Sequence, residues 1–154
     1  MHEKDRRLGR KLRMTFYESS EGPCVTLFGP IDVELDALRD CFRRLSDGGG
    51  EVQLDELEFI IPFGGVTLLA ECVDATSSHG SPQRRAVSRR SATGLSFVWR
   101  QSRDAWTITT ELVEGLIDSP TAGHQYLSEY PEGDALILAS KGEFSDRVLA
   151  EYRH

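Results

Sequence analysis

Apolar and polar residues in the first quarter of the chain change from a strand pattern to a helix pattern. The stretch "TFYESSEGPCVTLFG", residues 15–29, has two β-prone runs around a Ser-Ser-Glu-Gly-Pro turn, which predicts a hairpin. The next stretch, "PIDVELDALRDCFRRL", predicts a helix because its apolar residues recur at helical spacing, at Leu35, Leu38, Phe42 and Leu45. We expect Asp32 to cap this helix and "SDGGGE" to end it.

Residues 51–73 return to strand patterns. In "EVQLDELEFIIPFGG" the apolar alternation changes phase after Leu54, and a turn or bulge at Asp55-Glu56 explains the change. The stretch "GVTLLAECV" is short and β-branched at its start, which favours a further strand.

Two segments lack the apolar residues that a packed element needs. Residues 75–93 contain five serines, four arginines and Val87 as the one aliphatic residue, which predicts a flexible, disordered loop inserted in the domain. Residues 1–13 have Leu8 and Leu12 as their aliphatic residues and predict a flexible basic tail, and Met14 is a candidate native start.

The second half of the chain resembles the first in its order of elements. A hairpin is predicted in "GLSFVWRQSRDAWTIT", turning at residues 102–104, followed by a helix in "TELVEGLIDS". Residues 124–139 predict a second hairpin through "PEGD", and "FSDRVLAEYR" a C-terminal helix capped by Ser145. We therefore expect one α+β domain over residues 14–154, with antiparallel-rich sheets and two or three helices. Its two similar hairpin–helix–strand halves are separated by the flexible loop, and a degenerate duplication is one explanation of the similarity.

Charge is distributed unevenly. The 154 residues carry a net charge of -7, but residues 1–13 and 75–93 each carry +4, so the remaining 122 residues carry -15. An acidic surface repels nucleic acid and anionic membranes, and it suits solubility or a basic protein partner. Three scattered cysteines and the lack of an apolar leader favour a reducing, cytoplasmic location.

Catalytic and metal-binding patterns are weak. None of the four histidines pairs with a cysteine at metal-ligand spacing, and the three cysteines lie in apolar contexts that are typical of packed side chains. Neither "DGGGE" nor "PFGGV" has the pattern of a phosphate-binding loop. We therefore expect no metal, no cofactor and no catalytic residue, and the balance favours a protein that is not an enzyme.

The candidate binding residues form two groups. His124, Tyr126 and Tyr130 crowd into one short stretch, and with Trp99 or Trp106 they would make a polar-aromatic patch suited to an interface or a pocket. The carboxylates Asp55, Glu56 and Glu58 form the second group, whose negative charge suits a basic partner. Each group also has a purely structural interpretation. The aromatic group would be the end of a strand whose polar groups are hydrogen-bonded to the backbone, and the carboxylates would be a solvent-exposed turn.

Residues 25–72 also resemble a known family. "LFGPID" and "VQLDELEFI" are similar to segments in the core of STAS domains, the anti-sigma-factor antagonists. The resemblance implies a regulatory module and a helix at residues 66–73. Pro62-Phe63-Gly64-Gly65 stands where that family has its phosphorylatable serine.

Three functional hypotheses follow. The leading one is a non-enzymatic cytoplasmic protein-interaction module with an acidic surface, of the inhibitor or immunity class, and open strand edges also suit a homodimer. The second is a small-molecule-binding domain or an enzyme, with a site where His124, Tyr126 and the Gly64-Gly65 turn converge. The third is a STAS-like regulatory module.

Overall fold

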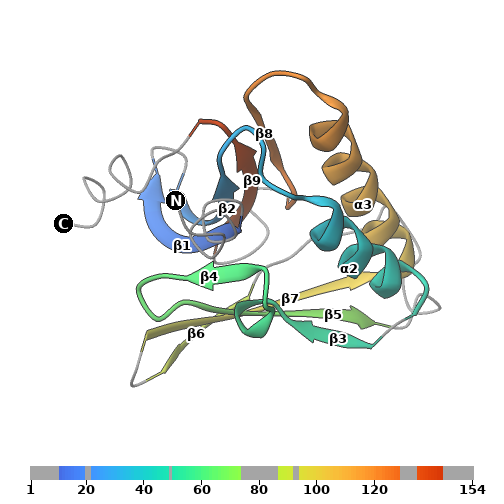
Figure 1. The fold of residues 1–154 in the computed structure, drawn as a ribbon. Coiled ribbons are helices and arrows are strands. Elements are labelled where there is room, and N and C mark those ends of the chain that lie inside the picture. The colour runs from blue at the N-terminus through green and yellow to red at the C-terminus, as the bar shows by residue number, and fades with distance from the viewer. Residues whose placement is uncertain are drawn as a thin grey trace.

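The computed structural model describes residues 11–19, 22–48, 50–73, 87–91, 94–128 and 135–143. They form the predicted single α+β fold, with helices α2 (Asp36–Ser46) and α3 (Arg103–Asp118) and two sheets (Figure 1). The five-stranded sheet has the order β4-β1-β2-β9-β8, and the four-stranded sheet the order β3-β5-β7-β6. The strands are β1 (Leu12–Ser19), β2 (Gly22–Gly29), β3 (Glu51–Gln53), β4 (Ile60–Pro62), β5 (Thr67–Val73), β6 (Val87–Ser91), β7 (Gly94–Ser102), β8 (Gly123–Tyr126) and β9 (Leu136–Lys141), with a 3-10 turn, η1 (Leu54–Glu56).

The first predicted hairpin is confirmed, but it begins earlier than expected. Strands β1 and β2 pair antiparallel from Arg13 opposite Phe28 to Ser19 opposite Gly22. Leu12 is fully buried, and its N–H donates to the carbonyl of Phe59 at 3.0 Å. The predicted tail is therefore wrong for residues 12 and 13, because burial of Leu12 holds them in the sheet. Residues 1–10 lie outside the described residues.

The apolar stripe of α2 is confirmed, whereas the predicted start of the helix is wrong. Leu38, Phe42 and Leu45 are fully buried on one face. The helix begins at Asp36, four residues after the expected cap, because residues 30–33 close a turn in which the Val33 N–H donates to the Pro30 carbonyl at 2.9 Å. Leu35 occupies the N-cap position and makes no side-chain cap hydrogen bond. Burial of Val33 and Leu35 fixes the segment that leads into it.

The phase change at Asp55-Glu56 is confirmed and moves the chain between sheets. Strand β3 pairs with β5, η1 turns the chain, and β4 then pairs with β1 of the other sheet. Strand β5 is also confirmed. The helix that the STAS resemblance implies at residues 66–73 is therefore wrong.

Two predictions around residue 90 are wrong. Residues 87–91, inside the predicted flexible loop, form β6 and pair antiparallel with β7; residues 74–86 and 92–93 lie outside the described part. The hairpin turn predicted at 102–104 does not form, because β7 continues to Ser102 and α3 begins at the next residue. The Ser102 hydroxyl accepts the Ala105 N–H at 3.3 Å, so it acts as a helix cap. The helix predicted at 110–119 is the second half of α3.

The predicted C-terminal hairpin is confirmed in its pairing. Strands β8 and β9 pair antiparallel from Gly123 opposite Lys141 to Tyr126 opposite Leu138. Residues 129–134, which include the predicted turn, and the helix predicted at 144–153 lie outside the described residues.

The two similar halves exchange their hairpins. The first half runs β1-β2 hairpin, α2, β3-β5 antiparallel pair, and the second runs β6-β7 hairpin, α3, β8-β9 antiparallel pair. Between the halves, β2 pairs parallel with β9, and β5 pairs parallel with β7. Each sheet therefore joins the hairpin that begins one half to the antiparallel pair that ends the other half.

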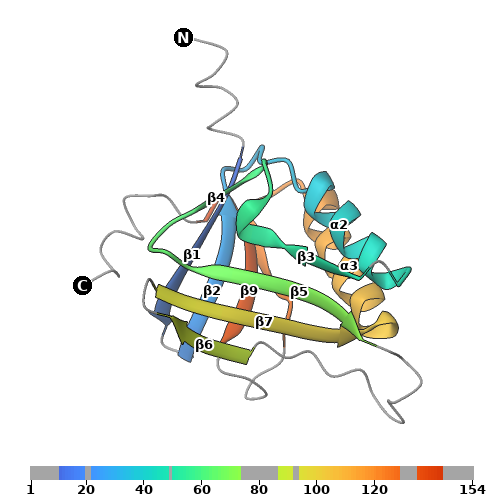
Figure 2. The ribbon, with the colours of Figure 1, turned by 90° about the horizontal axis from the view of Figure 1, so that it is seen from below.

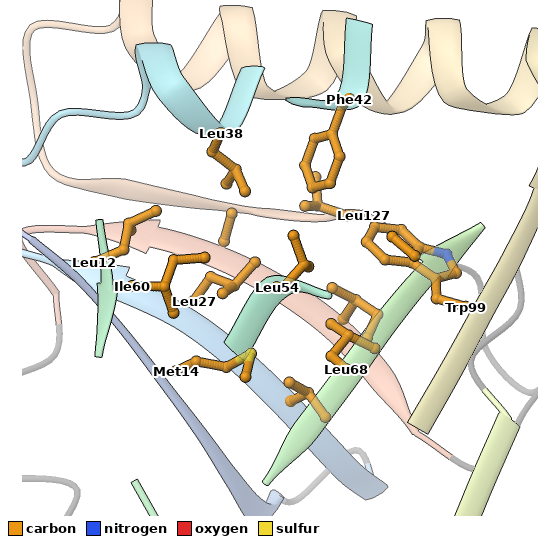
Figure 3. Close-up of a cluster of buried hydrophobic side chains, with 14 of the residues drawn as sticks. Leu12, Met14, Leu27, Leu38, Phe42, Leu54, Ile60, Leu68, Trp99 and Leu127 are labelled. Carbon is orange, nitrogen blue, oxygen red and sulfur yellow. The ribbon is translucent and has the colours of Figure 1, made fainter. Parts of the chain in front are cut away.

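The main core lies between the two sheets and the helices (Figure 3). At one end, Phe42 packs on Trp106 and Trp99 with ring centroids 5.4 and 5.6 Å away, and the two indoles lie 4.7 Å apart. The Trp106 indole N–H donates to the Glu71 carbonyl at 2.9 Å. Both tryptophans are fully buried, so their predicted place in an exposed aromatic patch is wrong: their large apolar area is used in the core.

Candidate functional site

Strands β2 and β9 of the five-stranded sheet are buried at every position along Cys24–Gly29 and Leu136–Lys141, so both faces of the sheet are shielded from solvent there. Successive side chains of a strand point to opposite faces. Val25, Leu27 and Ile137 belong to the main core, whereas a second cluster lies on the other, outer face. We call this second cluster the outer patch; it consists of Tyr17, Cys24, Tyr126, Leu136 and Leu138.

Strand β8 brings His124 and Tyr126 to this outer face. Tyr126 lies opposite Leu138 in the sheet and is half-buried against the outer patch. His124 lies opposite Ser140, and 47% of its side chain is exposed. The two rings meet edge to face, with centroids 5.8 Å apart. The predicted pairing of His124 with Tyr126 is therefore present, and Tyr130 lies outside the described residues.

A carboxylate links β8 to the end of β9. Oε1 of Glu143 lies 2.7 Å from His124 Nδ1 and accepts from the Ser140 hydroxyl at 3.2 Å. The chain reaches this position by a turn at Gly142, whose φ of +74° suits glycine and whose N–H donates to the Gly29 carbonyl at 2.8 Å. Ser140 is fully buried and is hydrogen-bonded to Glu143 rather than to His124, so this arrangement is not that of a serine nucleophile with its base. The contacts of Glu143 with His124 and Ser140 hold the edge strand β8 against β9, and they place the Glu143 carboxylate on the outer face.

The expected meeting of His124 with the Gly64-Gly65 turn does not occur. The two glycines follow β4, which is one edge of the five-stranded sheet, whereas His124 is on β8, which is the opposite edge. A pocket shared by these residues is therefore excluded by the strand order.

The predicted carboxylate group divides into one structural residue and two surface residues. Asp55 Oδ1 accepts the Leu68 N–H at 3.0 Å and the Gln53 side-chain amide at 2.6 Å, so Asp55 holds η1 against β5. Glu56 and Glu58 are exposed, and neither makes an ion pair with a residue that the structure describes. These two carboxylates keep their negative charge available on the surface.

The structure adds Glu51 to them. It is exposed at the start of β3, an edge strand of the four-stranded sheet, and no described residue forms an ion pair with it. The place of Glu51 was not predictable because it depends on the pairing of β3 with β5, in which Glu51 lies opposite Glu71, and local alternation does not show pairing. We call Glu51, Glu56 and Glu58 the acidic edge.

Next to the acidic edge lies the outer face of the four-stranded sheet. Gln53, Leu69 and Val98 are neighbours across three strands and are half-buried. Arg100 donates to Glu71 at 2.7 Å on the same face. Figure 2 shows β3, β5, β7 and β6 nearest the viewer, with no described helix or strand in front of them. We call this surface the open face; it consists of Gln53, Leu69, Glu71, Val98 and Arg100.

The described residues offer little for nucleophilic or metal chemistry. Burial raises the pKa of the half-buried Cys72 thiol, an effect that Arg103 opposes more weakly, so this thiol stays protonated and is a poor nucleophile. Cys24 and Cys41 are buried. Within the described ranges, no three His, Cys, Asp or Glu side chains gather as metal ligands.

Comparisons with protein-family models, with curated proteins and with solved structures found no match to this chain. Among the described residues there is no helix of the length and apolarity that a membrane span requires.

Proposed function

We propose that this protein is a non-enzymatic protein-interaction module whose binding surface is the acidic edge together with the open face. The observation that carries the proposal is a sheet face on which no described helix or strand packs, bordered by three exposed carboxylates that lack a described ionic partner. Apolar contact area contributes to the affinity of a complex, and unpaired charge beside it orients the partner and raises the association rate.

The charge of this surface favours a basic partner. The described segment 50–73 contains five acidic residues and no basic one. Glu71 is paired with Arg100 and Asp55 is hydrogen-bonded within the fold, which leaves Glu51, Glu56 and Glu58 to act on a partner. Like charges repel nucleic acid and anionic lipid from the same surface, so we propose a protein partner instead.

The open face supplies the apolar part of the surface. Leu69 and Val98 are adjacent in the sheet, and Val73 near the end of β5 is 39% exposed. Among the described strands, β3 pairs on one side alone, and the backbone groups of its other edge suit an added strand. A partner with a basic, β-prone segment fits both features.

Affinity capture from a lysate of the source cells tests the proposal with two triple variants. The test variant is Glu51→Gln, Glu56→Gln, Glu58→Gln. The control variant Asp104→Asn, Glu111→Gln, Asp118→Asn removes the same charge from the exposed side of α3. We expect one protein to be captured by the unsubstituted chain and the control variant, and to be lost or reduced with the test variant. Its association rate with the test variant should fall by about tenfold at low salt, and with the control variant by less than about twofold.

Leu69→Asp tests the apolar part, with circular dichroism to confirm folding. It should slow association little and speed dissociation, because apolar contacts act after encounter. Capture that is equal for the unsubstituted chain, both triple variants and Leu69→Asp would contradict this binding surface.

We also propose a cytoplasmic location and allow for a homodimer. All three cysteines are free thiols, which suits a reducing compartment. Strands β3 and β6 are the edges of the four-stranded sheet in the part of the chain that the structure describes, which suits pairing between two copies. Analytical ultracentrifugation over a range of concentrations distinguishes a monomer from a dimer.

A further inference from the structure

Two buried side chains of β7 each have one polar atom without a hydrogen-bond partner among the residues that the structure describes. They are the indole nitrogen Nε1 of Trp99, which is a donor, and the amide oxygen Oε1 of Gln101, which is an acceptor. Trp99 is 0% exposed and Gln101 is 1% exposed, so solvent reaches neither atom from outside. Most buried polar groups in proteins are bonded to protein or to ordered water, because an unsatisfied group is costly. An unsatisfied donor near an unsatisfied acceptor therefore points to a ligand that bonds to both.

The two side chains lie side by side between β7 and α3. Trp99 and Gln101 are two residues apart on one strand, so they project from the same face, with Cα atoms about 6.6 Å apart. The Trp99 indole packs on Trp106 with ring centroids 4.7 Å apart, and the Gln101 amide donates to the Thr109 hydroxyl at 2.9 Å. Trp106 and Thr109 are three residues apart on α3, so both contacts are made with the same side of that helix.

The hydrogen bonds of Thr109 fix the orientation of the Gln101 amide. The single hydroxyl proton of Thr109 is donated to the Ala105 carbonyl at 3.0 Å, so this hydroxyl can only accept from Gln101. Gln101 must therefore turn its NH2 group toward Thr109, and a reversed amide would place two acceptors against each other. The amide oxygen is the atom that needs a further donor, and turning the side chain over does not supply one.

The chemistry of the two atoms selects the ligand. It must accept from the indole N–H and donate to the amide oxygen, which excludes a metal cation at the first atom and an anion at the second. Water does both, and a water bonded to each atom at about 2.8 Å bridges a donor and an acceptor up to about 5.6 Å apart. Buried waters commonly make about three hydrogen bonds, and the Thr109 oxygen has one lone pair left for the third.

We infer that an internal water molecule binds between Trp99 and Gln101, where it accepts from the indole N–H and donates to the amide oxygen. The water links the end of β7 to α3, and it gives Gln101 a reason to occupy a buried position beside the aromatic cluster. The inference does not rest on the proposed function, which uses the acidic edge and the open face.

Proton NMR of the unsubstituted chain tests the inference, with water itself as the ligand observed. A long-lived internal water gives a nuclear Overhauser cross-peak of the sign found within a protein, whereas surface water does not. We expect such a cross-peak between water and the indole N–H of Trp99. The indole N–H of Trp106 is the internal control, because it donates to the Glu71 carbonyl at 2.9 Å, and its cross-peak should be much weaker or absent. A missing cross-peak at Trp99 would overturn the inference.

A pair of variants shows whether Gln101 holds the water. Gln101→Met removes the amide oxygen and keeps the Thr109 hydroxyl, so the cross-peak at Trp99 should be lost. Gln125→Met makes the same change at a half-buried glutamine on β8 of the other sheet and should leave the cross-peak unchanged. A cross-peak that persists in folded Gln101→Met would overturn the inference, because it would assign the signal to the Thr109 hydroxyl or to another source.

A high-resolution crystal structure of the unsubstituted chain decides the matter if circular dichroism shows that Gln101→Met does not fold. We expect one peak of solvent density within about 3.2 Å of both Trp99 Nε1 and Gln101 Oε1. No peak at that position, or an indole N–H that donates directly to a protein oxygen, would overturn the inference.

Discussion

Asp55 and Glu56 are adjacent carboxylates with different environments, and they should differ in their effect on stability. Asp55→Ala leaves the Leu68 N–H and the Gln53 amide without their acceptor, so we expect a loss of about 2 kcal/mol in the free energy of unfolding. Glu56→Ala removes an exposed side chain of the same 3-10 turn and should change stability by less than about 0.5 kcal/mol. Urea denaturation measures both values, and equal losses in the two variants would show that the Asp55 bonds contribute no net stability.

At the residue scale, the sequence identified the chemical types in the candidate site but not their exposure. His124 and Tyr126 are neighbours on one strand face, as the alternation of side chains predicts. The two tryptophans were assigned to the surface on residue type alone, although both pack in the core. Exposure depends on which strand lies beside each residue, and a local pattern contains no such information. The same reason explains why Glu51 was missed and Asp55 was grouped with surface acids.

The two helices begin for different physical reasons, and the cap of α3 can be tested. Ser102→Ala removes the acceptor of the Ala105 N–H, so we expect α3 to lose a cap and the protein to lose about 1 kcal/mol of stability. Ser102→Thr keeps a hydroxyl at the same position and should retain most of that stability. Thermal unfolding followed by far-ultraviolet circular dichroism compares the variants. Equal losses for Ala and Thr would indicate that packing at this buried position, rather than capping, is responsible.

At the element scale, apolar periodicity predicted interiors well and ends poorly. The stripe of α2, the β1-β2 hairpin and β5 were all visible in the sequence. The start of α3 was not, because Ser-Arg-Asp suits both a turn and a helix N-terminus. Strand β6 was missed because it is an edge strand with one aliphatic residue, held by its backbone pairing with β7. Side-chain patterns have little information about such a strand.

For the whole molecule, the exchange of hairpins between the halves decides how the core is shared. The parallel pairs β2–β9 and β5–β7 join residues that are far apart in the sequence. Phe42 of the first half packs on Trp99 and Trp106 of the second. The similar order of elements in the two halves was predictable, but these pairings were not, because a parallel pair leaves no local signal such as a tight turn. Neither half contains a complete sheet of its own.

This exchange predicts that the two halves fold only together. A protease site placed within residues 74–86, between β5 and β6, allows the folded chain to be cut without removing a described strand. After cleavage, the two pieces should co-elute in gel filtration and keep the near-ultraviolet circular dichroism of the packed tryptophans, because both sheets remain paired across the halves. Their unfolding should become dependent on protein concentration, since association now replaces a covalent link. Each piece, separated in denaturant and returned to buffer alone, should lack the tryptophan signal, and mixing the two should restore it. A single piece that regains a cooperative unfolding transition by itself would show that its half can form a core without the exchanged hairpin.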